Sequence, residues 1–170
     1  NRAVANNKMS FNPFADYRVE RQIVSPDFLT EDELRKIINF NSPLPRLERT
    51  RDMFLFACYT GLSYIDVKTL KAEHLERDNQ GRMWIKKNRV KTGVLSRIPL
   101  LPSAKILLDK YAGNETLMPI YSSQDINVYL KDIAILCHID KRITFHTARH
   151  TFASTVTLAN NVSLKIKTKM

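Results

Sequence analysis

A helical segment from Leu47 to Tyr59 constrains the fold of this chain more than any other stretch. From Met53 onward its side chains are almost all apolar, and a helix that is apolar on every side is buried. Gly61 follows and supplies the left-handed residue at which such a helix ends. The 170 residues suffice for one domain with a core of its own. We therefore expect one domain with this helix in its core.

Two capping patterns mark helices on either side of that segment. Thr30 is followed three residues later by Glu33, which predicts the start of a first helix. Ser63, followed by Asp66, predicts a second and shorter one. Downstream, apolar patterns predict helices over roughly 104–111, 122–138 and from 147. The core candidates in the middle one of these are Val128, Leu130, Ile133, Ala134 and Leu136.

Between about His74 and Leu100 the pattern changes from helical to strand-like. Short runs alternate with turns, and the clearest hairpin joins Met83–Lys87 to Val94–Leu100 around a turn with Gly93. This hairpin is basic, and such a charge run is most often a solvated edge that deters pairing with other strands. The predicted fold class is α+β, mainly helical, with a small antiparallel sheet of two or three strands.

The charge balance points to a polyanionic partner. Twenty-seven Lys and Arg stand against seventeen Asp and Glu, a net charge of +10, which favours nucleic acid first and an anionic membrane second. We find no apolar run of membrane-spanning length and no apolar core of a signal peptide, and expect an intracellular protein. Cys58 and Cys137 lie in apolar surroundings and are predicted to be buried free thiols.

Three ionisable side chains gather in the segment Ile143–Asn160. His146 lies three residues before Arg149 and four before His150, so a helix here places them on one face. Backbone N–H groups at the helix start, the helix dipole and the guanidinium together favour a phosphate. On this segment alone, solvated or capping side chains are the plainer interpretation. The histidine spacing matches the zinc motif HExxH, but Thr147 stands where the glutamate belongs, so we expect no metal.

Three segments carry the most specific pattern of the chain: TGLSYIDVKTL at 60–70, KTGVLSRIPL at 91–100 and TFHTARHTFAS at 144–154. In order and spacing they resemble the catalytic domain of the tyrosine recombinases, the phage integrase family. The resemblance covers about Thr30–Ile166 and is particularly to integrases of mobile elements, such as conjugative transposons, from the Bacteroidetes. It implies a site-specific DNA recombinase that works through a covalent 3′-phosphotyrosyl intermediate, without metal or other cofactor.

The resemblance also implies roles for individual residues. Arg149 matches the second arginine of the family and His146 the histidine or lysine before it, both directed at the phosphoryl oxygens. Lys91 matches the lysine that protonates the departing 5′ oxygen. Asp66 matches an acidic residue that positions its neighbours, and His150 follows the arginine as in many members, bonding within the site.

The chain departs from the family at Ser63, where the first arginine is expected. A serine cannot supply a charged, bidentate donor. Either another cation reaches the phosphate, for which Arg89 is the candidate, or the N-terminus of the short helix that Ser63 caps provides backbone N–H groups.

A second departure concerns the nucleophile. In the family, a His or Trp and then the catalytic tyrosine follow the arginine, whereas every tyrosine here precedes His146. We therefore expect this chain to be a fragment, or to lack a stretch near Ile166–Lys167, and to be inactive alone. The six tyrosines are Tyr17, Tyr59, Tyr64, Tyr111, Tyr121 and Tyr129.

By the same resemblance, residues 1–25 are the end of a core-binding domain and a linker, and 26–170 are the catalytic domain, truncated or incompletely ordered at its C-terminus. The expected partner is a double-stranded DNA attachment site, bound by a homotetramer in the bacterial cytoplasm on the nucleoid. Accessory DNA-bending proteins are further candidate partners, and a fragment alone is expected to be monomeric. The candidate DNA-binding residues are Lys86, Lys87, Arg89, Lys141 and Arg142.

Two alternatives stay open. One is a catalytically degenerate relative that binds DNA without cutting it, as a dismantled site at Ser63 would indicate. The other is an RNA-binding or membrane-binding basic domain, which has only the net charge of +10 in its favour.

Overall fold

Helix α3, Pro45–Thr60, is the core element of the structure, a computed structural model that describes residue 11 and residues 27–113 and 116–157. Pro45 occupies the first turn, where a missing N–H costs nothing. Every residue from Thr50 to Cys58 is buried. Gly61, left-handed with a φ of 65°, ends the helix. The predicted buried helix and its glycine cap are confirmed.

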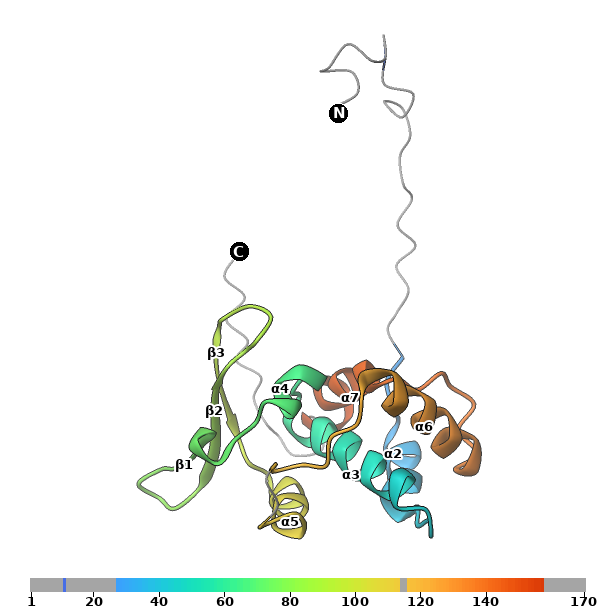
Figure 1. Cartoon of the computed structure of the whole chain (residues 1–170), viewed down its shortest axis with the longest axis horizontal. Coiled ribbons are helices and arrows are strands. Elements are labelled where there is room, and N and C mark those ends of the chain that lie inside the picture. The colour runs from blue at the N-terminus through green and yellow to red at the C-terminus, as the bar shows by residue number, and fades with distance from the viewer. Residues whose placement is uncertain (1–10, 12–26, 114–115, 158–170) are drawn as a thin grey trace.

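Among the described residues, five further helices pack against α3 (Figure 1). The last of them continues as a π-helical turn, η2 (Phe152–Val156), which also contacts α3. Thr30 and Glu33 form the predicted capping box at the start of the first. The five are α2 (Glu31–Asn39), α4 (Tyr64–Lys68), α5 (Pro102–Lys110), α6 (Ser123–Leu136) and α7 (Phe145–Thr151).

Helix α6 buries a different face from the one its apolar residues alone indicate. Leu130, Ile133 and Ala134 are buried as predicted, and Ile126 joins them one turn earlier. Val128 and Leu136 are 53% and 56% exposed, so the prediction that they belong to the core is wrong. The reason is helical spacing: positions 126, 130, 133 and 134 share one face of the helix, and positions 128 and 136 fall outside it.

The sheet has three antiparallel strands in the order β1–β2–β3. They are β1 (Leu75–Arg77), preceded by the 3-10 turn η1 (Ala72–His74), β2 (Met83–Asn88) and β3 (Leu95–Pro99). In the register, Lys87 pairs with Ser96, and Lys86 pairs with Arg97. Alternate residues of β2 face inward, so Ile85 and Lys87 are buried whereas Lys86 is exposed. The sheet stands at one side of the helices (Figure 1), and the predicted hairpin is confirmed.

A buried carboxylate ties α5 to α3. Asp52, which is fully buried, accepts hydrogen bonds from Arg51 Nη2, Lys110 Nζ and the Tyr111 hydroxyl, each at 2.7 Å. Lys110 also donates to Glu48 at 2.7 Å. Two carboxylates and two basic side chains therefore neutralise one another between the two helices.

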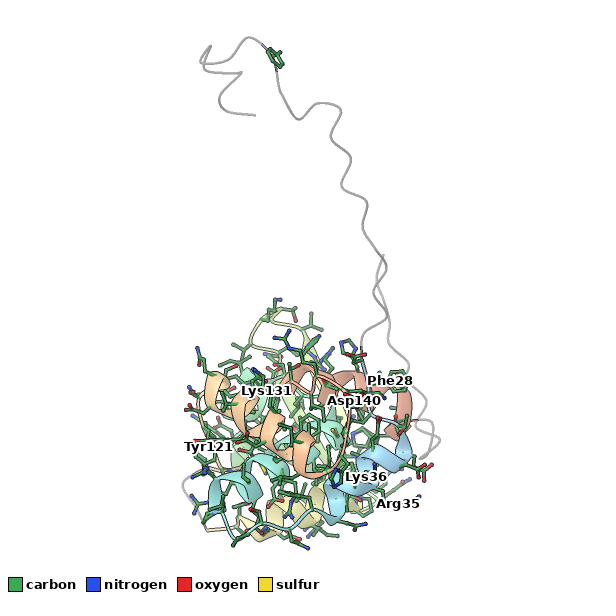
Figure 2. All side chains as sticks on the ribbon, turned by 90° about the vertical axis from the view of Figure 1, so that its right-hand side faces the viewer. Phe28, Arg35, Lys36, Tyr121, Lys131 and Asp140 are labelled. Carbon is green, nitrogen blue, oxygen red and sulfur yellow. The ribbon has the colours of Figure 1, made fainter. Side chains whose placement is uncertain are left out.

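Helices α2 and α6 present charged side chains to solvent, among them Lys36 and Lys131 (Figure 2). Cys58 and Cys137 are buried and unpaired, as predicted. No helix in the described part of the chain is long and apolar enough to cross a membrane. The linker predicted for residues 1–25 and the end of the last helix near Asn160 lie outside the described residues, apart from Phe11.

Candidate active site

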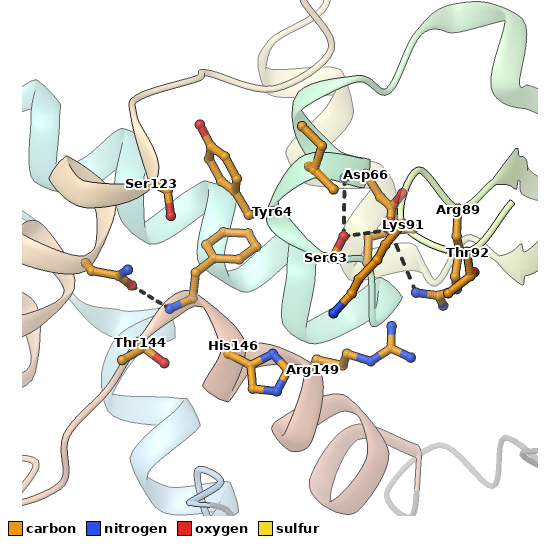
Figure 3. A pocket seen from close by; sticks show the side chains of 14 residues that line it. Ser63, Tyr64, Asp66, Arg89, Lys91, Thr92, Ser123, Thr144, His146 and Arg149 are labelled. Carbon is orange, nitrogen blue, oxygen red and sulfur yellow. Dashed lines mark hydrogen bonds and ion pairs between the residues drawn. The ribbon is translucent and has the colours of Figure 1, made fainter. Parts of the chain in front are cut away.

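A pocket of about 720 Å³ opens between α4, the β2–β3 hairpin and the starts of α6 and α7. Its lining brings together Arg89, Lys91, His146 and Arg149, which are separated by up to 60 residues in sequence (Figure 3). Asp66 is the single carboxylate among the described lining residues. The pocket therefore carries more positive than negative charge.

The guanidinium of Arg149 is bonded to Gly61, the residue that ends α3. Its Nη1 donates to the Gly61 carbonyl at 2.9 Å, and its Nε and Nη2 have no hydrogen-bond partner among the described residues. Glycine is required at position 61 because its φ is positive and because a Cβ there would lie 2.5 Å from the Phe152 ring. The αL cap of α3 thus fixes one edge of the guanidinium and leaves the other edge available.

Arg89 reaches the pocket because it continues the inward-facing series of β2 beyond Lys87. Its Nε donates to Ser96 Oγ at 2.7 Å, and its Nη1 lies 3.8 Å from Asp66 Oδ2. Burial and the charge of Arg149 lower the pKa of Arg89, and Asp66 opposes that change. Arginine stays protonated in proteins, so the lowered pKa reflects the energetic cost of burying this guanidinium and, secondly, of holding it beside that of Arg149.

Asp66 links α4 to the hairpin. Its side chain is 2% exposed, with Oδ1 accepting from Val90 N at 2.9 Å and Oδ2 accepting from the Ser63 hydroxyl at 2.6 Å. Ser63 Oγ in turn accepts from Asp66 N at 3.4 Å, which caps α4. Because it bonds the neighbouring carboxylate, Ser63 does not replace the missing arginine. The reciprocal capping box predicted for this pair is replaced by a direct bond between the two side chains.

Lys91 stands in the hairpin turn, directly after the residue that Asp66 holds. The turn is closed by Gly93, whose N–H donates to the Arg89 carbonyl at 2.8 Å and whose φ is 67°. Lys91 is exposed at the rim of the pocket. It has neither an ion pair nor a hydrogen bond with any described residue, so its ammonium is available to a ligand.

His146 and His150 lie one helical turn apart on α7, with ring centroids 4.6 Å apart in an edge-on arrangement. Partial burial, then the charges of His150, Arg149 and Lys91, lower the pKa of His146. The lowered pKa favours the neutral ring of His146, which can donate one hydrogen bond. No group of three His, Cys, Asp or Glu residues suited to a metal ion occurs in the described chain.

The other candidate DNA-binding residues differ in their exposure and in whether they have a partner. Arg142 is exposed and has no partner among the described residues, and Lys86 is exposed but paired with Glu76 at 2.9 Å. Lys141 donates to Glu33 at 2.7 Å, between α2 and the start of α7. Lys87 is 7% exposed and donates to the Thr69 carbonyl at 3.0 Å. Because this ammonium is enclosed and already bonded, Lys87 is not part of the DNA surface that we propose below.

Tyr64 lines the pocket, but its hydroxyl donates to the Tyr121 carbonyl at 2.9 Å and points away from Arg149 (Figure 3). Two contributors to the site were not predicted from the sequence, the Gly61 carbonyl and the Ser96 hydroxyl. Strand alternation across the predicted hairpin could have indicated Ser96, because it places Arg89 and Ser96 on the same face of neighbouring strands.

The sequence profile of the phage integrase family matches residues 27–166 of the chain. Among solved structures, the chain is similar to lambda integrase in a dimer bound to a COC′ core site, with a TM-score of 0.71 and 23% identity. That alignment covers 92% of this chain and 48% of the other. No curated protein matches the chain.

Two further solved structures share the fold. XerH recombinase bound to its difH substrate has a TM-score of 0.61 and 17% identity, covering 85% of this chain and 47% of the other. The integrase of transposon Tn1549 (residues 82–397), in complex with circular intermediate DNA, has a TM-score of 0.66 and 16% identity, covering 95% and 62%. The chain thus spans about half the length of the lambda integrase and XerH chains and 62% of the Tn1549 integrase chain. Their likeness confirms the predicted fold class, mainly helical with a three-stranded antiparallel sheet.

Proposed function

The chain belongs to the phage integrase family, and from that premise we propose that it is the catalytic domain of a site-specific DNA recombinase. In this proposal the full-length protein integrates or excises a mobile element, by cutting and rejoining double-stranded DNA through a covalent 3′-phosphotyrosyl intermediate. The reaction uses no metal and no other cofactor. The particular resemblance to Bacteroidetes elements stays a prediction.

The observation that carries the proposal is the surplus of positive charge in the pocket. Arg89, Lys91 and Arg149 meet there with a single carboxylate, Asp66. Two guanidinium groups that repel each other, each with donors still free, form a site in which the single negative charge of a phosphate diester reduces the repulsion and its oxygens accept hydrogen bonds from both. Charge at this density is unfavourable without an anion, so the site is built for one.

The basic side chains of the pocket divide two tasks in this mechanism. Arg149 and Arg89 donate to the non-bridging oxygens, on which negative charge grows as the tyrosine oxygen attacks phosphorus. His146 donates to the same oxygens. The bond between phosphorus and the 5′ oxygen breaks, and Lys91 gives that oxygen a proton. Arg89 thereby takes the place of the family's first arginine, whose position Ser63 occupies.

No described tyrosine supplies the nucleophile. Tyr64 is the one described tyrosine that lines the pocket, and its hydroxyl donates to the Tyr121 carbonyl and is turned away from the cations. We propose that the full-length protein provides it. The exposed cations outside the pocket set the geometry of DNA contact, and among them Arg142 has no partner within the described residues. A tetramer on two DNA sites, accessory DNA-bending proteins and action in the bacterial cytoplasm complete the proposal.

Trapping the covalent intermediate tests the function. The full-length protein is incubated with a nicked suicide duplex carrying the attachment site, which is mapped by sequencing the junctions of the element in its host. A denaturing gel then reports protein joined to DNA. We expect an adduct with the full-length protein and none with the 170-residue chain. An adduct with the 170-residue chain would overturn the assignment of the nucleophile.

The same trapping experiment distinguishes the recombinase from the main alternative, a relative that binds DNA without cutting it. That alternative is favoured by Ser63, whose hydroxyl is occupied by Asp66. Tight, salt-sensitive binding of the same duplex without any adduct would contradict the recombinase proposal and establish the DNA-binding relative in its place.

A further inference from the structure

Arg89 is a cation of the pocket that, in the described part of the chain, is oriented by a single side-chain hydrogen bond. Its side chain is 23% exposed and starts at the end of β2, where the hairpin leaves the sheet. Asp66 lies 3.8 Å from Nη1, which is an ion-pair distance and too long for a hydrogen bond. Both carboxylate oxygens of Asp66 are already occupied, by Val90 N and by the Ser63 hydroxyl. Asp66 therefore offsets the charge of Arg89 without orienting it.

The hydrogen bond that orients Arg89 comes from β3. Ser96 Oγ accepts from Arg89 Nε at 2.7 Å, and within the described residues it is the only hydrogen bond of this guanidinium. Because Nε is the donor nearest the chain, this bond fixes the plane of the group and leaves the Nη donors directed at the pocket. Arginine discriminates by this planar geometry, so its orientation matters as much as its charge.

The sheet register makes this contact available. Ser96 pairs with Lys87, and Arg89 lies two residues beyond Lys87 on the same face, so Arg89 and Ser96 are diagonal neighbours across the two strands. Arg89 N also donates to the Val94 carbonyl at 3.0 Å, which holds its backbone against the partner strand. The hydroxyl and the guanidinium therefore meet through paired backbone that fixes both of them.

We propose that Ser96 is a positioning residue that aims Arg89 at the scissile phosphate, an inference that rests on the proposed function. Ser96 acts through Arg89 and touches no reacting atom. In this way Ser96 helps Arg89 to replace the arginine that is missing at position 63. Because Arg89 extends from the hairpin, the acceptor that orients it must also lie on the hairpin, and Ser96 on β3 is that acceptor.

Two variants of equal shape isolate the hydroxyl. Ser96→Thr keeps it and Ser96→Val replaces it by a methyl group, and both side chains suit a strand. The readout is the single-turnover rate of adduct formation by the full-length protein on the nicked suicide duplex, at saturating DNA. We expect Ser96→Thr to stay within about threefold of wild type and Ser96→Val to be about tenfold slower, with an unchanged Kd for the duplex.

A double-mutant cycle separates positioning from a structural role. In the Arg89→Ala background, which is expected to be about 10²–10³ slower than wild type, Ser96→Val should cause no further loss, because the residue it positions is gone. A full tenfold loss in that background, or equal rates for Ser96→Thr and Ser96→Val, would overturn the inference.

The same measurements separate this inference from the proposed function. No adduct with the wild-type protein refutes both. An adduct whose rate does not change in Arg89→Ala refutes the assignment of Arg89 and, with it, the role of Ser96. A slow Arg89→Ala variant beside a Ser96→Val variant at the wild-type rate leaves the recombinase proposal intact and refutes only the role of Ser96.

Discussion

Two aspartates, Asp52 and Asp66, are buried to nearly the same degree, at 0% and 2% exposed, and each lies among cations. The cluster around Asp52 is balanced, because Glu48 and Asp52 face Arg51 and Lys110. Burial alone would lower the pKa of Lys110, but hydrogen bonds to the two carboxylates raise it above its ordinary value. The charges of this cluster satisfy one another.

The cluster around Asp66 is unbalanced in the same low-dielectric setting. Three basic side chains, Arg89, Lys91 and Arg149, line the pocket with it. The pKa of Arg89 is lowered, the opposite direction to that of Lys110. The balanced cluster joins two helices, whereas the unbalanced one opens onto the pocket that we propose as the phosphate site. The degree of burial is nearly the same for both aspartates and therefore does not distinguish the two clusters. The net charge of the side chains around each aspartate distinguishes them.

Breaking the balanced cluster is expected to have the largest effect. Asp52→Ala should lower the free energy of unfolding by about 3–5 kcal/mol, because Arg51 and Lys110 lose the carboxylate they share. Urea unfolding followed by circular dichroism measures it. Asp109→Ala, which removes an exposed carboxylate of α5, is the control and should cost about 0.5 kcal/mol or less. Equal stabilities of the two variants would contradict a structural role for the cluster.

Removing a cation from the unbalanced cluster should do the reverse, lowering activity while sparing stability. We expect Arg149→Ala to slow adduct formation by about 10²–10³. Its free energy of unfolding should change by less than about 1 kcal/mol, because the lost bond to the Gly61 carbonyl is offset by less repulsion from Arg89.

The control for that variant is Arg35→Ala, which removes an exposed arginine of α2 that is paired with Glu31 and lies outside the pocket lining. Its adduct rate should match wild type. If Arg149→Ala destabilised the domain as much as Asp52→Ala does, the pocket cations would be structural and the comparison between the two clusters would fail.

The features predicted correctly are those decided within a few residues of sequence. The capping box of Thr30 and Glu33, the glycine cap at Gly61 and the turn at Gly93 that closes the hairpin all depend on neighbours three to five positions away. The signal for α3 is similarly local, because a run of apolar residues longer than one helical turn leaves no polar face.

The features that were missed depend on strand register and on long-range contacts. Lys87 was grouped with its exposed neighbours because charge alone does not tell which face of a strand a residue occupies, and a shift by one position reverses it. The bond from Arg149 to the Gly61 carbonyl joins residues 88 positions apart. No local pattern encodes such a contact, so the sequence predicts the cations that line the pocket without indicating what holds them.

A smaller effect distinguishes paired from unpaired cations outside the pocket. Arg142→Ala should weaken duplex binding about fivefold and reduce the slope of log K against log salt by about 0.9, because one phosphate contact is lost. Lys87→Met should leave that slope unchanged, because its ammonium already donates to the Thr69 carbonyl. Fluorescence anisotropy over a salt series measures both. A reduced slope for Lys87→Met would show that Lys87 reaches DNA after all.

The smallest effect expected is a pH dependence that comes from His146. Its pKa is lowered in the free domain by partial burial and by His150, Arg149 and Lys91. A phosphate in the pocket offsets those charges and favours the protonated ring, so the pKa is higher in the complex and binding takes up a proton. Duplex affinity should therefore rise by about threefold as the pH falls from about 8 to about 6, across the range in which histidine ordinarily titrates. His146→Gln should abolish this rise and His74→Gln, on η1, should keep it, whereas matching profiles for the two variants would show that His146 does not face the phosphate.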